Sequence, residues 1–126
     1  MSKILVVDDS EVVRMQVTRI LTNAGYEILQ AEDGEMGVEV AEQNADISLI
    51  LSDYNMPGMD GLTMLETIRK TAKHQKTFCG VLTTESSQGL KEKGKEIGVG
   101  VWIVKPVDAK KLIKITETVF ARLKAS

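Results

Sequence analysis

The chain has 126 residues, 43% of them hydrophobic, which is enough for one continuous core, so we expect residues 1–126 to form a single domain. Its 16 Lys and Arg against 18 Asp and Glu leave a net charge of −2, which argues against nucleic acid as a partner. The lone cysteine, Cys79, excludes a disulfide framework and is expected to lie buried in a strand. No signal peptide and no apolar stretch near the roughly 20 residues of a membrane span is found, so we expect a cytoplasmic protein without membrane contact.

Short apolar runs alternate with longer stretches of helical period along the chain. The first run, Ile4–Val7, is followed by a helical pattern that ends at Gly25, a residue suited to the left-handed position past a helix. The second run, Ile28–Ala31, has polar neighbours that indicate an edge strand, whereas the other runs look buried on both faces. A weaker helical pattern follows at 34–44.

The middle of the chain continues this alternation. The apolar run at Leu49–Leu51 precedes a helix that Asp60 is expected to cap. His74, which stands among Lys73, Gln75 and Lys76, is expected in a solvated loop. The apolar run at Phe78–Leu82 then predicts the fourth strand.

The last third of the chain predicts two helices and one strand. The fourth helix, expected at 87–97, contains Gly89 and Gly94, which each cost about 1 kcal/mol relative to alanine in a helix interior. We therefore expect this helix to be loosely held. The fifth apolar run, Val99–Val104, leads to a helix that Asp108 is expected to cap.

Five strands that alternate with five helices predict an α/β fold with a parallel sheet covered on both faces. Parallel strands need crossover connections of a helix's length, and these crossovers place helices over the sheet. Ligands of such sheets bind beyond the carboxyl ends of the strands. Polar residues that directly follow the strands are therefore the candidates for a functional site.

Polar residues follow four of the predicted strands at the point where the apolar run stops. They are Asp8 and Asp9, Asp53, Thr83 and Thr84, and Lys105. Two carboxylates about 4 Å apart repel each other by roughly 4 kcal/mol at an effective dielectric of 20, so a cation is expected among them. Mg²⁺ fits best, because it uses one or two carboxylates and leaves room for a phosphate oxygen. No His or Cys stands at a spacing suited to zinc.

A carboxylate at such a site can accept a phosphoryl group if the incoming charge is neutralised and its oxygens are oriented. We expect Asp53 to be the acceptor. Mg²⁺ would take one phosphoryl oxygen and Lys105 a second one. The Thr83 hydroxyl and the Thr84 backbone N–H would hold the third.

Four segments of the chain resemble the receiver domains of two-component response regulators, especially the single-domain CheY-like chemotaxis type. The matching segments are Ile4-Leu5-Val6-Val7-Asp8-Asp9-Ser10, Leu51-Ser52-Asp53-Tyr54-Asn55-Met56-Pro57-Gly58-Met59-Asp60-Gly61, Thr83-Thr84-Glu85 and Lys105-Pro106. The resemblance covers essentially the whole chain. It implies a flavodoxin-like fold with the strand order 2-1-3-4-5, of which CheY is itself a known example, and no output domain.

The resemblance also implies roles for the acidic residues. Asp53 would accept the phosphoryl group from a sensor histidine kinase of the CheA type and would also bind Mg²⁺. Asp9 would be a direct metal ligand, Asp8 would act on the metal mainly through water, and Asn55 would contribute its backbone carbonyl. Asn55 and Glu85 would tune the lifetime of the phosphoryl group.

Three further residues would sense the phosphoryl group and report it. Thr83 and Lys105 resemble the two phosphoryl-sensing groups, and the Lys105–Pro106 bond is expected to be cis. Trp102 resembles the aromatic that packs inward when the Thr83 hydroxyl swings toward the phosphoryl group. Phosphorylation can bias such a two-state element through local contacts alone.

The output of the switch would be a protein contact on the fourth helix, fifth strand and fifth helix. Lys91 stands where regulators that bind the flagellar motor present an apolar contact, which argues against that target. Without an output domain, the chain would bind a downstream protein or serve as a phosphate sink. A monomer is expected.

Two functions from other classes stay open on the sequence. A metal-dependent phosphatase places a second acid two residues after its nucleophile, but Ser10 stands two residues after Asp8. A flavin-binding module shares the architecture, yet a flavin phosphate prefers backbone N–H groups and hydroxyls to carboxylates. A receiver is not an enzyme beyond its own phosphorylation and dephosphorylation.

Overall fold

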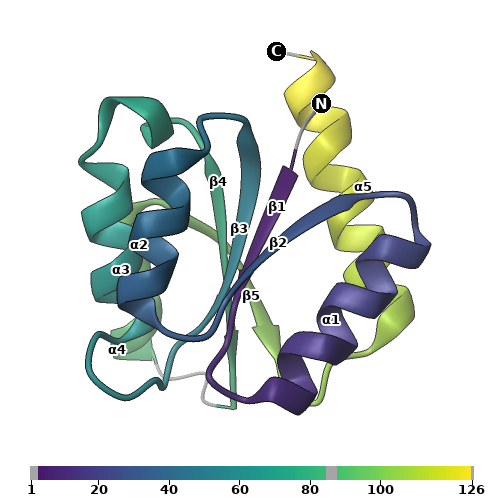
Figure 1. Cartoon of the computed structure of the whole chain (residues 1–126), viewed down its shortest axis with the longest axis horizontal. Coiled ribbons are helices and arrows are strands. Elements are labelled where there is room, and N and C mark those ends of the chain that lie inside the picture. The colour runs from purple at the N-terminus through teal and green to yellow at the C-terminus, as the bar shows by residue number, and fades with distance from the viewer. Residues whose placement is uncertain (1–2, 85–87, 126) are drawn as a thin grey trace.

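The computed structural model describes residues 3–84 and 88–125, in which strands and helices alternate (Figure 1). The elements are β1 (Lys3–Val7), α1 (Glu11–Asn23), β2 (Glu27–Ala31), α2 (Gly34–Gln43), β3 (Ile47–Asp53), α3 (Gly61–Arg69), the short 3₁₀ helix η1 (Ala72–His74), β4 (Phe78–Thr83), α4 (Gln88–Ile97), β5 (Val99–Val104) and α5 (Ala109–Ala125). In the described part of the chain, no helix is both long and apolar enough to span a bilayer.

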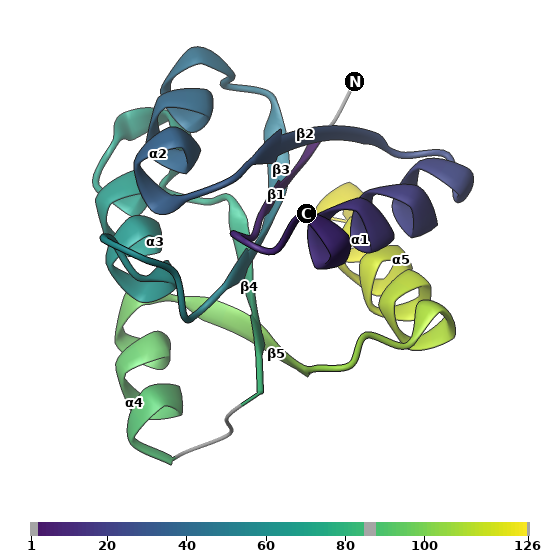
Figure 2. The ribbon, with the colours of Figure 1, turned by 60° about the horizontal axis from the view of Figure 1, so that its bottom comes forward.

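The sheet is parallel, and its strand order β2-β1-β3-β4-β5 confirms the order that the resemblance implied. Helices α2, α3 and α4 cover one face and α1 and α5 the other (Figures 1 and 2). Because all five strands point the same way, their carboxyl ends meet at one rim. The α/β fold predicted from the sequence is therefore confirmed.

The core consists of two apolar clusters, one on each face of the sheet. Successive residues of β1 alternate between them, since side chains of a strand point to opposite faces. Leu5 and Val7 join the cluster under α2, α3 and α4, whereas Ile4 and Val6 join the cluster under α1 and α5. All four side chains are fully buried, and burial of each stabilises the fold by roughly 1.5–3 kcal/mol.

Helices α1, α2, α3 and α5 begin at side-chain caps, as the sequence predicted for the last two of these. Asp60 Oδ1 accepts a hydrogen bond from the Thr63 N–H at 2.8 Å, and Asp108 Oδ1 accepts one from the Lys110 N–H at 2.9 Å. Gly25, after α1, has φ = +98°, a conformation that favours glycine. These predicted helix boundaries are confirmed.

Strand β5 is more exposed than its apolar sequence predicted. It is the second edge strand of the sheet, and its last residue, Val104, is 55% exposed. The expectation that this run is buried on both faces was wrong. An apolar run predicts a strand, but it does not show whether that strand lies at the edge or in the interior of the sheet.

His74 is buried against α2 rather than exposed in a solvated loop. Its side chain is 1% exposed, with Nε2 2.6 Å from the Ala41 carbonyl oxygen and Nδ1 2.9 Å from Thr77 Oγ1. The sequence expectation was wrong because these partners come from α2 and from the segment before β4. The polar neighbours of His74 in sequence do not reveal that contact.

Candidate functional site

Three carboxylates meet at the rim formed by the carboxyl ends of β1 and β3. Asp8, Asp9 and Asp53 each offer one oxygen, and these oxygens all lie within 4.8 Å of one another. The parallel register of β1 with β3, in which Val7 is opposite Ser52, brings the two strand ends side by side. The predicted convergence of the acidic residues is therefore confirmed.

Lys105 brings its ammonium group into the acidic cluster. Its Nζ lies 3.1 Å from Asp8 Oδ2 and 3.2 Å from Asp53 Oδ1. The Lys105 backbone N–H donates to the Thr83 carbonyl oxygen at 2.9 Å, which ties the segment after β5 to the end of β4. The Lys105–Pro106 peptide bond is cis, as the resemblance implied.

The backbone around the cluster is held by local contacts. The Ser10 N–H donates to Asp8 Oδ1 at 2.9 Å, and Arg14 Nη1 donates to the Asp8 carbonyl oxygen at 2.7 Å. Asp8 is fully buried and Asp53 is 6% exposed, whereas Asp9 is exposed. The cluster is therefore rigidly placed on its inner side and open to solvent on its outer side.

Gly61 lies at the site beside Asp53, a position that its sequence context did not predict. A Cβ at this position would overlap the carbonyl oxygen of Asp53 and lie 3.2 Å from Ser52 Oγ. Only glycine therefore lets the start of α3 approach the backbone of Asp53 so closely. The sequence signal was its place beside Asp60 in the motif that follows Asp53.

Burial and the neighbouring charges shift the pKa of two members of the cluster. Burial, followed by the charge of Asp8, raises the pKa of the Asp53 carboxyl, and the hydrogen bond from Lys105 only partly opposes this rise. Burial alone would lower the pKa of Lys105, but its hydrogen bonds and charge interactions with Asp8 and Asp53 outweigh burial and raise it. The pKa of Asp53 is therefore raised mainly because its charged form is held away from water, with the charge of Asp8 as the second cause.

These residues suit Mg²⁺. Their donors are carboxylate oxygens, which hard divalent cations prefer, and the exposed Asp9 leaves a side where metal-bound water would remain. In the cluster that the structure describes, three carboxylates gather, and the ammonium of Lys105 pairs with two of them, Asp8 and Asp53. The excess of two negative charges matches a divalent ion.

The other predicted site residues occupy different positions around this rim. Thr83 is buried at the end of β4, and Thr84, the next residue, is exposed. Asn55 is exposed two residues beyond Asp53. Glu85, predicted to tune the phosphoryl lifetime, lies outside the described residues. The roles of these residues stay predictions.

Trp102 lies on β5, on the face covered by α2, α3 and α4. It is opposite Val81 in the register of β4 with β5 and packs against the apolar cluster of that face. Its side chain is half-buried. An inward movement of the indole remains a prediction.

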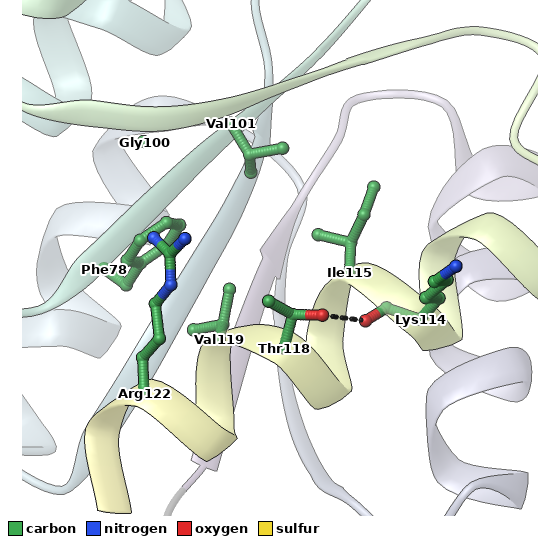
Figure 3. Close-up of a pocket in the computed structure, with 8 residues that line it drawn as sticks. All are labelled: Phe78, Gly100, Val101, Lys114, Ile115, Thr118, Val119 and Arg122. Atoms are coloured by element: carbon green, nitrogen blue, oxygen red, sulfur yellow. Dashed lines mark hydrogen bonds between the residues drawn. The ribbon is translucent and has the colours of Figure 1, made fainter. Parts of the chain in front are cut away.

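A separate pocket of about 290 Å³ lies between β4, β5 and α5 (Figure 3). Its lining consists of Phe78, Gly100, Val101, Lys114, Ile115, Thr118, Val119 and Arg122. Phe78 and Gly100 come from the starts of their strands, so the pocket lies toward the end of the sheet opposite the acidic cluster. None of these lining residues carries a carboxylate, so the pocket lacks the metal-binding donors that the cluster offers.

The sequence matches the family model of the response regulator receiver domain over residues 4–117. A probable chemotaxis protein CheY from Rhizobium etli is 32% identical over 123 residues, which cover 97% of this chain and 95% of that protein. Protein PilH of Pseudomonas aeruginosa is 33% identical over 121 residues, with coverage of 96% and 99%. In each comparison the similarity spans nearly the full length of both proteins.

The structure has solved counterparts as well. The chemotaxis protein CheY4 of Vibrio cholerae, crystallised at low pH, superimposes with a TM-score of 0.90 at 37% sequence identity. The match covers 94% of this chain and 98% of that protein. Sequence and structure therefore point to the same group of proteins.

Proposed function

Since this chain belongs to the response regulator receiver domain family and is a phosphorylation-activated signalling switch of the CheY-like type, we propose that Asp53 is its phosphoryl acceptor. Members of this family are signalling proteins rather than enzymes that turn over a metabolite, and they bind Mg²⁺ at an acidic cluster. The observation that carries the assignment is the meeting of Asp8, Asp9, Asp53 and Lys105 at one rim of the sheet.

Each residue of this site has its own role in the proposed phosphoryl transfer. The Asp53 carboxylate attacks phosphorus as the bond to the donor's leaving group breaks, and the electron pair of that bond stays with the leaving group. Lys105 neutralises charge on the incoming phosphoryl group, and the Thr83 hydroxyl and Thr84 backbone N–H orient its oxygens. Asp8, Asp9, Asp53 and the Asn55 carbonyl would hold Mg²⁺, which would supply further charge neutralisation.

The proposed donor is a sensor histidine kinase of the CheA type in the cytoplasm, whose phosphohistidine would transfer to Asp53. The side of the cluster at Asp9 is exposed and gives a donor access. The first helix after the cluster also presents apolar groups, because Val12 is 76% and Met15 is 50% exposed. A partner helix with an apolar face would bury these side chains beside the site.

The proposed output surface is the α4-β5-α5 face. Trp102 on β5 and the 55% exposed Val104 belong to it, and both lie on the strand next to β4, which carries Thr83. Lys91 is exposed on α4, which speaks against an apolar contact with a flagellar motor protein at that position. A downstream protein of a chemotaxis pathway binds this face of the monomer in its phosphorylated form; a phosphate sink would have no such partner.

The acceptor assignment is tested by intact-protein mass spectrometry after incubation with Mg²⁺ and a small acyl phosphate. The wild-type chain gains about 80 Da as a phosphoryl group replaces a proton, and Asp53→Asn does not. Asp60→Asn is the matched control, because asparagine also caps helices and Asp60 is the N-cap of α3. A mass gain that persists in Asp53→Asn contradicts the proposal.

A further inference from the structure

The indole of Trp102 lies directly against the backbone of α4 at Gly94. A Cβ built on Gly94 would overlap Trp102 Cζ2, and it would lie 3.1 Å from Cη2 and 3.4 Å from the Cβ of Val99. Gly94 is itself buried. The ring therefore occupies space that any other residue at position 94 would fill.

Gly94 stands in the middle of the apolar stripe of α4. Leu90 and Ile97, four residues before and three residues after it, are half-buried and pack with Trp102 against the same apolar cluster. The flanking residues Lys93 and Lys95 are exposed. Because Gly94 has no side chain, the face of α4 that packs on the sheet has a gap at this position, which we call the notch. The indole of Trp102 fills the notch.

This notch lies on the same face of the sheet as the proposed phosphoryl-sensing hydroxyl. Trp102 is opposite Val81, and side chains two residues apart in a strand share a face, so Thr83 points to the same side as Val81. Val104, two residues after Trp102, is opposite Thr83. On this face Thr83 therefore lies one two-residue repeat beyond Trp102, toward the carboxyl ends of the strands.

The carboxyl end of α4 is anchored independently of the indole. Arg69 Nε donates to the Ile97 carbonyl oxygen at 3.3 Å, and Arg69 Nη2 donates to the Gly98 carbonyl oxygen at 3.3 Å. Gly94 lies one turn before this anchor. Since α4 is anchored, a methyl group added at position 94 would press on the distal end of the Trp102 side chain, and the indole would have to move rather than the helix.

We propose that Gly94 is a positioning residue for Trp102. The notch at Gly94 holds the indole on α4 and thereby sets the equilibrium between an indole packed on α4 and an indole packed inward. The inference rests on the proposed function, since inward packing is coupled there to phosphorylation of Asp53. A side chain at position 94 closes the notch and displaces the indole. The displaced ring favours inward packing, and by linkage the protein then binds a phosphoryl mimic more tightly.

The test compares wild type, Gly94→Ala, Trp102→Phe and the double variant Gly94→Ala/Trp102→Phe. Phenylalanine lacks the distal ring atoms that a methyl group at position 94 would meet, so it removes the clash and leaves the added methyl group. Gly89→Ala is the matched control, because it is a second glycine of α4 and a Cβ there has no neighbour within 4 Å among the described residues. Calorimetry measures the affinity for beryllofluoride in the presence of Mg²⁺ for all five proteins.

The expected result is a gain in beryllofluoride affinity of about fivefold or more in Gly94→Ala, as for coupled sites in general. Gly89→Ala shows no such gain relative to wild type. The double variant shows none relative to Trp102→Phe. Quenching of Trp102 fluorescence by acrylamide without beryllofluoride falls in Gly94→Ala and is unchanged in Gly89→Ala. A gain that is equal in both alanine variants, or that persists in the Trp102→Phe background, overturns the inference.

Failure of the proposed function gives a different result. In that case wild type binds no beryllofluoride, or Asp53→Asn binds it as well, whatever residue stands at position 94. The fluorescence comparison still decides whether Gly94 positions the indole, because Trp102 is the only tryptophan of the chain. Unchanged quenching in Gly94→Ala overturns the positioning role directly.

Discussion

Lys105 Nζ lies 3.1 Å from Asp8 Oδ2, although the two residues are 97 positions apart in the chain. The same ammonium lies 3.2 Å from Asp53 Oδ1, so one cation serves two carboxylates. Both acidic side chains are buried, and they would otherwise repel each other. Lys105 is therefore a structural as well as a chemical element of the site.

Replacement of Lys105 by methionine is expected to lower the free energy of unfolding in Mg²⁺-free buffer by roughly 1–3 kcal/mol. The loss of one partner leaves buried carboxylates without their cation, and the open side at Asp9 keeps the cost below that of a fully enclosed pair. Urea denaturation measures the change. Lys111→Met, at an exposed position of α5, is the control and should change stability little. Equal effects of the two substitutions would show that the ion pairs do not stabilise the fold.

Asp53→Asn is expected to stabilise the Mg²⁺-free protein at neutral pH. The folded-state pKa of Asp53 is raised above its ordinary value of 3.8, so its contribution to stability is present below that pH and is lost as pH rises through the folded pKa. An amide removes the unfavourable charge, and Lys105 keeps its contact with Asp8. Thermal unfolding at several pH values should show a higher Tm for the variant at pH 7 and a shrinking difference below about pH 4. A lower Tm at pH 7 would contradict the sign of the shift.

Mg²⁺ is expected to raise the stability of the wild-type protein, because a ligand that binds only the folded state stabilises it. The gain is about 2.7 kcal/mol when the free ion is at 100 times its Kd. Asp9→Asn should lose most of this gain, whereas Asp46→Asn, at an exposed position before β3 and so at the opposite end of the sheet, should keep it. Tm is measured over a Mg²⁺ titration. No rise in Tm of wild type at millimolar Mg²⁺ would remove the metal assignment.

Cys79 is expected to resist thiol reagents in the folded protein. Burial raises its pKa from 9.0 to about 11, and the nearby charge of Arg69 opposes this only in part. The thiolate fraction at pH 8 is then roughly a hundredfold lower than for an ordinary thiol, and the buried side chain also blocks access. A colorimetric disulfide reagent should react slowly with the native chain and rapidly in urea. Fast reaction without denaturant would mean that β4 opens readily.

Arg69→Ala is expected to lower the free energy of unfolding by about 2–4 kcal/mol, since several carbonyl groups lose a charged donor. Arg69 Nη1 donates to the carbonyl oxygens of His74 and Thr77, while Nε and Nη2 donate to those of Ile97 and Gly98. Hydrogen exchange should increase in the last turn of α4. Lys70→Ala, at the exposed neighbouring position, is the control. Unchanged exchange at α4 in Arg69→Ala would show that this anchor is dispensable.

The sequence alone predicted the alternation of strands and helices, the parallel sheet and the polar residues at the strand ends. These features follow from local periodicity and from the rule that parallel strands need helical crossovers, which together place Asp8, Asp53 and Lys105 at one rim. The strand order itself came from the resemblance to a known family. Distances within the acidic cluster and the perturbed pKa of Asp53 could not be predicted, because both depend on strand register and on burial.

Only the tertiary structure decided which residues meet across the chain. The exposure of Val104, the burial of His74, the anchor at Arg69 and the contact of Trp102 with Gly94 all depend on which elements lie side by side. In the sequence Gly94 appeared as a weak point of α4, whereas in the structure its missing side chain makes room for the indole. Local patterns report the period of an element, but packing partners come from residues far apart in sequence, so their contacts emerge only when the sheet is assembled.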